Sequence, residues 1–249
     1  MKKTVMLILA IMMIVWVSLT NNAQAQSIIA APDGTGTVVT LNGQQSDISS
    51  GSLSVDGQNL FHSFQEFGLS SGEIADFLKQ PEVRNILIRV TGGNASIIDG
   101  AIQVSGSNAN LYLMNPAGIV FGPDANLNVP TAFTATTDDS IGFADGWFNA
   151  TGTNDYTRLV GNPNQFAFTT SDPGSSINAG NLAVAEGENL LLLGGTAINT
   201  GTLTVAAVPG ETLVRISQSD MLLDLEIGPI GTAGSPGSGE AGASSPSEL

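Results

Sequence analysis

The amino-acid sequence predicts an all-β solenoid, a parallel β-helix in which short strands stack coil upon coil. Short runs of alternating apolar and polar residues, such as 37–41, 85–90 and 101–104, are bounded by Gly, Asn, Asp, Ser and Pro. Such alternation is typical of strands, and these bounding residue types are typical of turns. Apolar residues at helical spacing are scarce. An internal repeat then favours a solenoid over other all-β folds.

The repeat has a period near 20 residues. Residues 177–184 read I-N-A-G-N-L-A-V and residues 198–205 read I-N-T-G-T-L-T-V, an offset of 21 residues (198 − 177). Residues 48–55 share the form I-x-x-G-x-L-x-V, and residues 98–104 are a looser copy. Each unit is interpreted as one coil, with its Ile, Leu and Val in interior columns. About seven coils, roughly 4.8 Å apart, are expected. The alternative is a β-sandwich whose strands share a motif by coincidence.

The first 25 residues predict a cleaved signal peptide. Lys2 and Lys3 precede an apolar run at 5–19, and Ala23 and Ala25 have the small-x-small spacing of a signal-peptidase site. The alternative is a membrane anchor. A helix of that run spans only about 22 Å, which is shorter than a hydrocarbon core of roughly 30 Å. Cleavage after Ala25 is therefore expected.

The remaining chain is expected to form one domain at 26–227 and a disordered tail at 228–249. The tail is mostly Gly, Ser, Ala and Pro, and it has too little apolar surface to offset the entropy lost on ordering. Without Lys2 and Lys3, five basic residues remain against 22 acidic ones, a net charge near −17. Such a chain repels phosphate backbones, so nucleic-acid binding is not expected. The absence of cysteine excludes disulfide bonds and thiolate metal sites.

One segment, residues 70–79, predicts a short helix. Ser70 and Glu73 have the spacing of a capping box, three apolar residues then form one face, and Pro81 follows.

The histidine and acidic residues that could act in catalysis do not form a pattern typical of an enzyme. His62 is the sole histidine and lies among phenylalanines, which favours a packed side chain over a catalytic base. Asp138 and Asp139 form the only adjacent acidic pair, and a solvated loop is the expected setting for them. No set of residues reaches the ligand count of a metal site, and no cofactor is expected. A solenoid enzyme that degrades polysaccharides is the least favoured hypothesis for the function of this chain.

Three aromatic residues, Trp147, Phe148 and Tyr156, follow the stretch 59–143. They are expected to cover an open end of the stack or to fill the core of a loop, and a binding surface is the less favoured alternative.

Three separated segments carry a family resemblance. Residues 59–67 read N-L-F-H-S-F-Q-E-F, residues 88–93 read I-R-V-T-G-G, and residues 108–123 read N-A-N-L-Y-L-M-N-P-A-G-I-V-F-G-P. In this order they closely resemble the filamentous haemagglutinin N-terminal domain, also called the two-partner secretion domain. The resemblance runs from about residue 27 to residue 229.

Two family motifs lie in the third segment. The first, usually N-P-N-L, has Ala109 in place of proline, and the second, usually N-P-N-G-I, has Ala117 in place of asparagine. Ala117 lacks the side chain for a local hydrogen bond. The resemblance implies that the matching residues are recognised by a transporter: Asn108, Asn110, Leu111, Asn115, Pro116, Gly118 and Ile119. The alternative is that the motifs only shape coil corners, since proline fixes φ and glycine accepts φ > 0.

The resemblance also implies a fold, partners and a location. It implies a right-handed parallel β-helix with N-terminal capping strands and no enzymatic activity. Members reach the periplasm through the Sec machinery by means of the signal peptide, and the POTRA domains of a cognate outer-membrane β-barrel transporter then engage them. The mature protein is extracellular or associated with the outer surface. A second hypothesis is a stand-alone secreted adhesin whose β-helix binds surface glycans or neighbouring cells.

Overall fold

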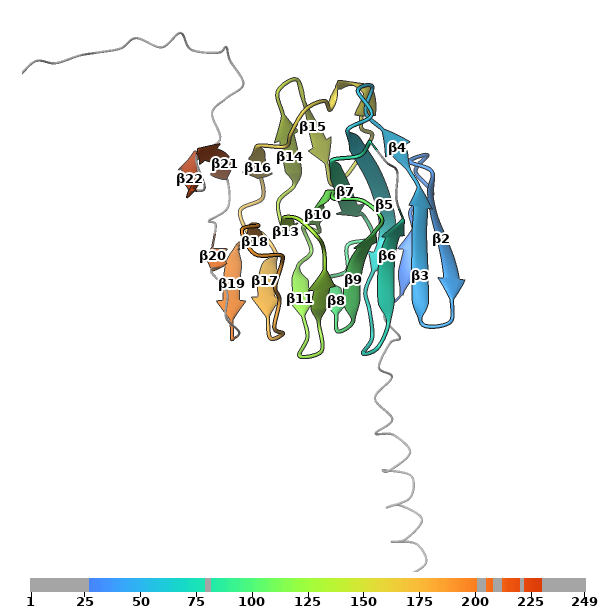
Figure 1. The fold of residues 1–249 in the computed structure, drawn as a ribbon. Coiled ribbons are helices and arrows are strands. Elements are labelled where there is room, and N and C mark those ends of the chain that lie inside the picture. Colours follow the sequence, from blue (N-terminus) through green and yellow to red (C-terminus); the bar gives the residue numbers. More distant parts are fainter. Residues whose placement is uncertain (1–26, 79–81, 201–204, 208–211, 220–221, 230–249) are drawn as a thin grey trace, which may run out of the picture.

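The computed structural model describes residues 27–78, 82–200, 205–207, 212–219 and 222–229. Strands dominate these residues, and one short 3-10 helix, η1 (Tyr156–Arg158), interrupts them. The strands stack into a right-handed parallel β-helix, as the sequence predicts (Figure 1).

Three sheets form the sides of the helix. Sheet A contains β1 (Ile28–Ala30), β5 (Asn59–Phe67), β7 (Asn85–Val90), β10 (Asn110–Met114), β13 (Phe133–Thr136), β18 (Leu190–Gly194) and β20 (Val205–Ala207), with β4 (Ser52–Leu53) paired to β5. Sheet B contains β2 (Thr37–Asn42), β3 (Gln45–Ser50), β6 (Ile74–Leu78), β9 (Ala101–Ser105) and β12 (Asn126–Asn128). Sheet C contains β8 (Ser96–Ile98), β11 (Ile119–Phe121), β17 (Ser175–Asn178) and β19 (Thr196–Asn199).

The chain runs from sheet A to sheet C to sheet B and back to sheet A, so that β7, β8 and β9 make one coil and β10, β11 and β12 make the next. In the first coil, between β5 and β6, a single parallel bridge from Leu69 to Ile98 takes the place of a sheet C strand. The described residues thus form three complete coils, and later turns have no strand in sheet B. The expectation of about seven full coils at strand spacing is wrong, because a fourth sheet uses part of the chain.

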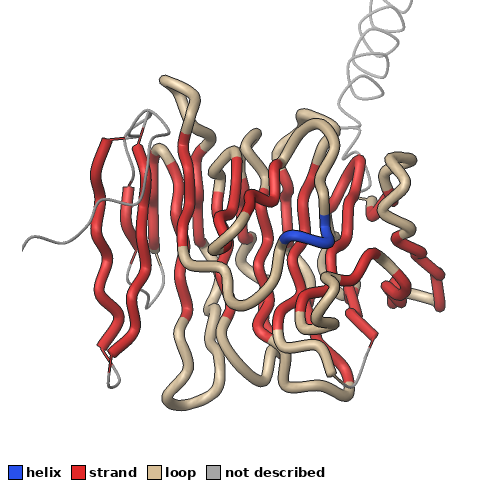
Figure 2. Tube along the Cα trace, turned by 90° about the horizontal axis from the view of Figure 1, so that it is seen from above, coloured by secondary structure: helices blue, strands red, loops and turns tan. Residues whose placement is uncertain are grey.

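That fourth sheet, sheet D, is antiparallel and lies outside the β-helix. It contains β14 (Ser140–Phe143), β15 (Gly146–Asn149), β16 (Gln165–Phe168), β21 (Thr212–Ser219) and β22 (Leu222–Pro229). The chain leaves the helix after β13, forms β14, β15 and β16, and re-enters it at β17. The view from above shows this excursion running along one side of the stack (Figure 2).

Two hydrophobic cores result. The inner core fills the helix, where Leu60, Ile86, Leu111 and Phe133 are in register on successive strands of sheet A. The second core lies between the outer face of sheet A and sheet D, and Phe61, Leu87, Ile141, Phe148 and Phe166 belong to it. Every residue of β7 is buried because both faces of this strand are covered.

Capping strands close the N-terminal end, as expected. β1 pairs antiparallel with β5, and the β2–β3 hairpin extends sheet B through parallel pairing of β3 with β6.

The helix predicted at residues 70–79 is wrong, because residues 74–78 form strand β6 between β3 and β9. Ala75 and Phe77 are fully buried there, and this burial outweighs local helix preference. The backbone N–H of Ser70 still donates to the Glu73 carboxylate (2.7 Å), so the contact of a capping box forms within a turn.

The repeat period is confirmed, but the side chains face the other way. Ile177 pairs with Ile198 in adjacent parallel strands, so the 21-residue offset is one coil. Ile198 is 47% exposed, whereas Ser176 and Asn178 are buried. The interior column expected for the isoleucines is therefore wrong at this position, and the strand is shifted by one residue relative to that expectation. The copy at 48–55 is not a coil, because it is divided between β3 and β4.

The leader expected at residues 1–25, with its cleavage residues Ala23 and Ala25, lies outside the described residues. Residues 230–249 of the expected tail do so too. Within the described part of the chain, no helix combines the length and hydropathy needed to cross a membrane.

Candidate functional site

The first motif, residues 108–111, forms the corner that leads into β10. Asn108 is exposed, Ala109 is fully buried, and Asn110 is half-buried at the first position of the strand. Leu111 follows with its side chain in the inner core. The alanine that replaces the family's proline thus packs beneath the corner.

Asn110 ends a row of asparagine side chains that crosses three coils. Its Nδ2 donates to Asn85 Oδ1 (3.0 Å), and Asn85 Nδ2 donates to Asn59 Oδ1 (2.8 Å). Asn59 Nδ2 then donates to the carbonyl oxygens of Leu159 and Gly161, each at 2.8 Å. The row satisfies buried amides and ties sheet A to the segment that precedes β16.

The second motif, residues 115–119, forms the corner between β10 and β11. The buried Asn115 side chain donates through Nδ2 to the Asn94 carbonyl (3.0 Å) and to Ser96 Oγ (2.9 Å), both in the preceding coil. Its Oδ1 accepts from the N–H of Ala117 (3.0 Å). Gly118 has φ of 122°, a left-handed conformation that glycine favours, and its N–H donates to the Asn115 carbonyl (3.0 Å).

The corner needs no side-chain hydrogen bond from Ala117, because Asn115 supplies the local one. Ala117 is exposed. On the side of the following coil, Gly174 packs directly against the turn: a Cβ added there would meet Pro116 O and would lie 2.7 Å from Gly118 N.

The structure therefore brings both motifs to the two ends of one strand, β10. Of the seven residues expected to be recognised, Asn108 is exposed, and Asn110 and Pro116 are half-buried. The other four are buried in the folded domain: Leu111, Asn115, Gly118 and Ile119. A partner can contact these four only in a chain whose coils have not yet stacked.

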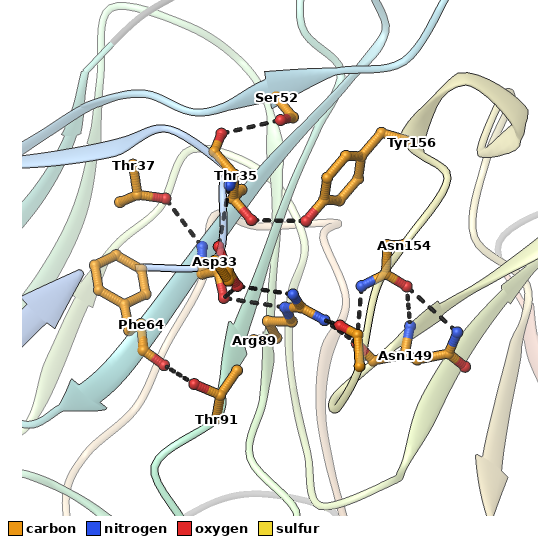
Figure 3. A network of polar contacts seen from close by, with 12 residues as sticks. Asp33, Thr35, Thr37, Ser52, Phe64, Arg89, Thr91, Asn149, Asn154 and Tyr156 are labelled. Carbon is orange, nitrogen blue, oxygen red and sulfur yellow. Dashed lines mark hydrogen bonds and ion pairs between the residues drawn. The ribbon is translucent and has the colours of Figure 1, made fainter. Parts of the chain in front are cut away.

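A buried ion pair that the sequence reasoning missed lies on the outer face of sheet A (Figure 3). Arg89 of β7 donates from Nη2 to Asp33 Oδ2 (2.7 Å), with 3% of the arginine and 24% of the aspartate side chain exposed. Arg89 Nε donates to Ser63 Oγ (3.0 Å), and Nη1 donates to the carbonyl oxygens of Asn149 and Gly152, each at 2.9 Å. Arg89, the one charged residue in the run at 86–90, was the available signal.

This cluster joins three parts of the fold: the N-terminal segment, sheet A and the end of β15. Burial works against ionisation of Asp33, but hydrogen bonds from Ser63, Thr35 and Arg89 outweigh it and lower the pKa of Asp33 to about 2. Thr35 Oγ1 is also 2.7 Å from the hydroxyl of Tyr156. Figure 3 shows the two sets of contacts side by side, and together they clamp the start of the domain to the excursion.

His62 and Asp138 are both fully buried and lie in different places. His62 packs against Phe64 and Phe77, as expected, and its Nε2 has no hydrogen-bond partner. The solvated loop expected for the acidic pair is wrong for Asp138, whose carboxylate oxygens are buried without a partner. Asp139 instead accepts hydrogen bonds from residues 169 and 170. Asp138 lies where the chain leaves β13 for β14.

These two groups predict opposite pH dependences of stability. Burial lowers the pKa of His62 to about 4. Above about pH 6.5 the imidazole is neutral in both the folded and the unfolded chain, and the fold loses no stability through this group. As the pH falls from there towards 4, only the unfolded chain binds the proton, so the free energy of unfolding decreases. Burial and the neighbouring Asp139 charge raise the pKa of Asp138 well above its ordinary value. Below about pH 4 this carboxyl is protonated in both the folded and the unfolded chain. As the pH rises from there, the unfolded chain loses the proton first, so the free energy of unfolding decreases. Each group contributes at most about 1.4 kcal/mol per pH unit.

Between pH 4 and pH 6.5 the two effects oppose each other. We expect urea unfolding of His62→Leu to show stability that falls with rising pH, and Asp138→Asn to show stability that falls with falling pH, by up to about 3 kcal/mol. The native chain is expected to vary less than either variant. Parallel curves for all three proteins would contradict this expectation.

Of the three aromatic residues, Phe148 and Tyr156 pack in or against the second core between sheet A and sheet D, rather than over an open end of the stack or in the core of a loop. Phe148 is fully buried and packs 5.0 Å from Phe61, which also packs 5.0 Å from Tyr156 (centroid distances). Trp147 is 38% exposed. Among the described residues, no group of three or more His, Cys, Asp or Glu side chains is arranged to hold a metal ion.

Comparisons with known proteins agree with this architecture. A family model described as the TPS secretion domain matches residues 26–238. The HMW1 secretion domain of Haemophilus influenzae has a similar fold, with a TM-score of 0.55 and 22% identity, over 81% of this chain and 48% of that chain.

Two curated relatives match shorter segments. The heme/hemopexin-binding protein of Haemophilus influenzae is 36% identical over 76 residues, which are 30% of this chain and 8% of that protein. The tRNA nuclease CdiA of Escherichia coli O6:K15:H31 is 39% identical over 69 residues, 28% of this chain and 2% of that protein. The chain thus corresponds to a small part of each relative's length.

Proposed function

Because this chain belongs to the TPS secretion domain family, we propose that a cognate outer-membrane β-barrel transporter recognises it and exports it to the cell surface. The match over residues 26–238 carries this proposal. The chain is the secretion domain of a two-partner secretion exoprotein, and such a domain is a β-helical secretion module rather than an enzyme. The nuclease named in the CdiA relative is an activity of that protein, of which the match covers 2%.

The steps before export follow from the leader. In our proposal, residues 1–25 deliver the chain to the Sec machinery and are removed after Ala25, which has the spacing of a signal-peptidase site with Ala23. The chain then meets the POTRA domains of the transporter in the periplasm.

We further propose that these domains read the two motifs before the coils stack. Burial of Leu111, Asn115, Gly118 and Ile119 in the folded domain supports this order. An extended chain can add a strand to an exposed sheet edge of a partner, with main-chain hydrogen bonds giving affinity and side-chain pockets giving specificity. The chain then folds into its β-helix at the cell surface.

The primary test measures mature protein in the culture medium with and without a candidate two-partner transporter. We expect protein in the medium only when the transporter is present. Release without the transporter, or retention in the periplasm with it, would reject the proposal. Circular dichroism of purified protein checks that each chain compared is folded.

A variant of Asn108 separates recognition from folding. This side chain is exposed and forms no hydrogen bond within the described chain, so Asn108→Ala is expected to leave thermal stability unchanged. We expect the same variant to lower secretion several-fold. Asn181→Ala is the matched control, since Asn181 is also exposed, lies outside both motifs and makes no side-chain hydrogen bond in the described structure. Equal secretion of the two variants would remove Asn108 from the recognised set.

A further inference from the structure

A cavity of about 300 Å³ opens on the outer face of sheet A at the edge of the second core, whose Phe166 and Leu191 help to line it. Its floor is Tyr112, Thr134 and Leu191, which are register neighbours on β10, β13 and β18. Asn164, from the segment that leads into β16, and Asn189, the residue before β18, line its sides. Its volume lies at the lower end of the range of small-ligand sites, roughly 300 to 1,000 Å³.

The polar groups around this cavity lack protein partners. The Tyr112 hydroxyl, the Thr134 hydroxyl and the side-chain amides of Asn164 and Asn189 form no hydrogen bond within the described chain. By contrast, the amides of Asn59, Asn85 and Asn110 in the row along sheet A all donate hydrogen bonds within the protein. Four donor–acceptor groups without a protein partner thus surround one cavity, Thr134 buried, Tyr112 and Asn189 half-buried and Asn164 exposed, and they are available to a polar ligand.

The charges around the cavity restrict the ligand class. Glu188 is the single ionisable acid among the lining residues and is exposed, and none of the described lining residues is basic. Burial raises the pKa of Tyr112 to about 12, so its hydroxyl is a neutral donor at physiological pH. The chain carries a net charge of −15, which disfavours phosphates and acidic sugars.

We propose that this cavity binds a neutral saccharide, a mono- or disaccharide unit of a surface glycan. Sugar hydroxyls both donate and accept hydrogen bonds, which matches the amides and hydroxyls around the cavity. The apolar C–H face of a pyranose matches Leu191 and Pro163. The site belongs to the folded domain and does not depend on recognition by a transporter.

The test uses purified full-length protein and saturation-transfer NMR. Its probes are three neutral disaccharides, lactose, cellobiose and chitobiose, with digalacturonate as the acidic control. We expect at least one neutral disaccharide to receive saturation with Kd near 1 mM, about −4 kcal/mol. No transfer to any neutral disaccharide, or equal transfer to digalacturonate, would overturn the proposal.

Two variants locate the binding. Tyr112→Phe and Asn189→Ala each remove one group that has no protein partner, so the fold is expected to keep its thermal stability. We expect each variant to weaken binding by roughly 3- to 10-fold, as for the loss of one hydrogen bond. Asn181→Ala, whose exposed amide lies outside the cavity, is expected to bind like the native chain. Native affinity in both cavity variants would place the sugar elsewhere and overturn the assignment.

Discussion

Replacing Arg89 with alanine is expected to lower the free energy of unfolding by about 3 to 5 kcal/mol, the range for removing one partner of a buried ion pair. The substitution removes the ionic contact with Asp33 and the hydrogen bonds to Ser63, Asn149 and Gly152. It also removes the guanidinium that lies 5.9 Å from the centre of the Phe148 ring. Urea unfolding at pH 7 measures the change.

Arg84→Ala is the matched control, because Arg84 precedes the same strand, is exposed and makes no side-chain hydrogen bond or ion pair in the described structure. It is expected to change stability by no more than about 0.5 kcal/mol. Asp33→Asn leaves the Arg89 charge buried without its counter-ion, so it is also expected to be strongly destabilising. A double-mutant cycle isolates the pair, and additivity of the two single changes would contradict direct coupling.

Substituting Gly174 with alanine is expected to cost more than about 3 kcal/mol, because an added Cβ would overlap backbone rather than a movable side chain. That Cβ would meet Pro116 O and would lie 2.7 Å from Gly118 N and 2.9 Å from Ala117 C. The clash therefore separates the coil of the second motif from the next coil. Thermal unfolding of purified protein measures the loss.

Gly187→Ala is the control for backbone conformation. Gly187 has φ of 86°, and nothing lies within 4 Å of an added Cβ, so only left-handed strain of about 1 to 2 kcal/mol is expected. A loss no larger at position 174 would contradict the packing argument.

The Gly174 variant also tests whether folding outside the cell helps to draw the chain through the transporter. If stacking of coils supplies this pull, Gly174→Ala is expected to lower secretion in proportion to its loss of stability. Secretion equal to that of the native chain would remove folding from the export step.

The sequence predicted the class of the fold better than the direction of its side chains. The 21-residue offset between Ile177 and Ile198 identified a coil, since a repeat survives in sequence when units pair in register. It could not tell which face of sheet C lies inside, because polar side chains, Ser176 and Asn178, occupy the buried positions of β17 while Ile198 of β19 is exposed. The apolar residues therefore did not mark the interior face of these strands.

The helix expected at residues 70–79 failed for a related reason. Its apolar residues fit a helical face as well as a strand, and only pairing of β6 with β3 and β9 decides between them. Sheet D was not predicted, because its strands contain no repeat, and Trp147, Phe148 and Tyr156 were expected only to cover an open end of the stack or to fill the core of a loop.

The candidate site was partly predictable. The motifs identified β10 and both of its corners from family resemblance and turn chemistry. The contacts of Asn110 and Asn115 could not be foreseen, because their partners lie in another coil 25 and 21 residues away. Asp33 and Arg89 are 56 residues apart, and no local pattern relates them.

The clamp at the start of the domain sets an order of assembly. Neighbouring coils join residues about one repeat apart, and short loops close at a small entropic cost. The contact between Thr35 and Tyr156 spans 121 residues, and the contacts from Asn59 reach Gly161 across 102. The first coils and the capping strands β1 and β3 can therefore pair early, since their partners β5 and β6 follow closely in the chain. The contacts of Thr35 with Tyr156 and of Asn59 with Gly161 form only after residues near 160 have joined the structure, so the attachment of the N-terminal end to the excursion comes late.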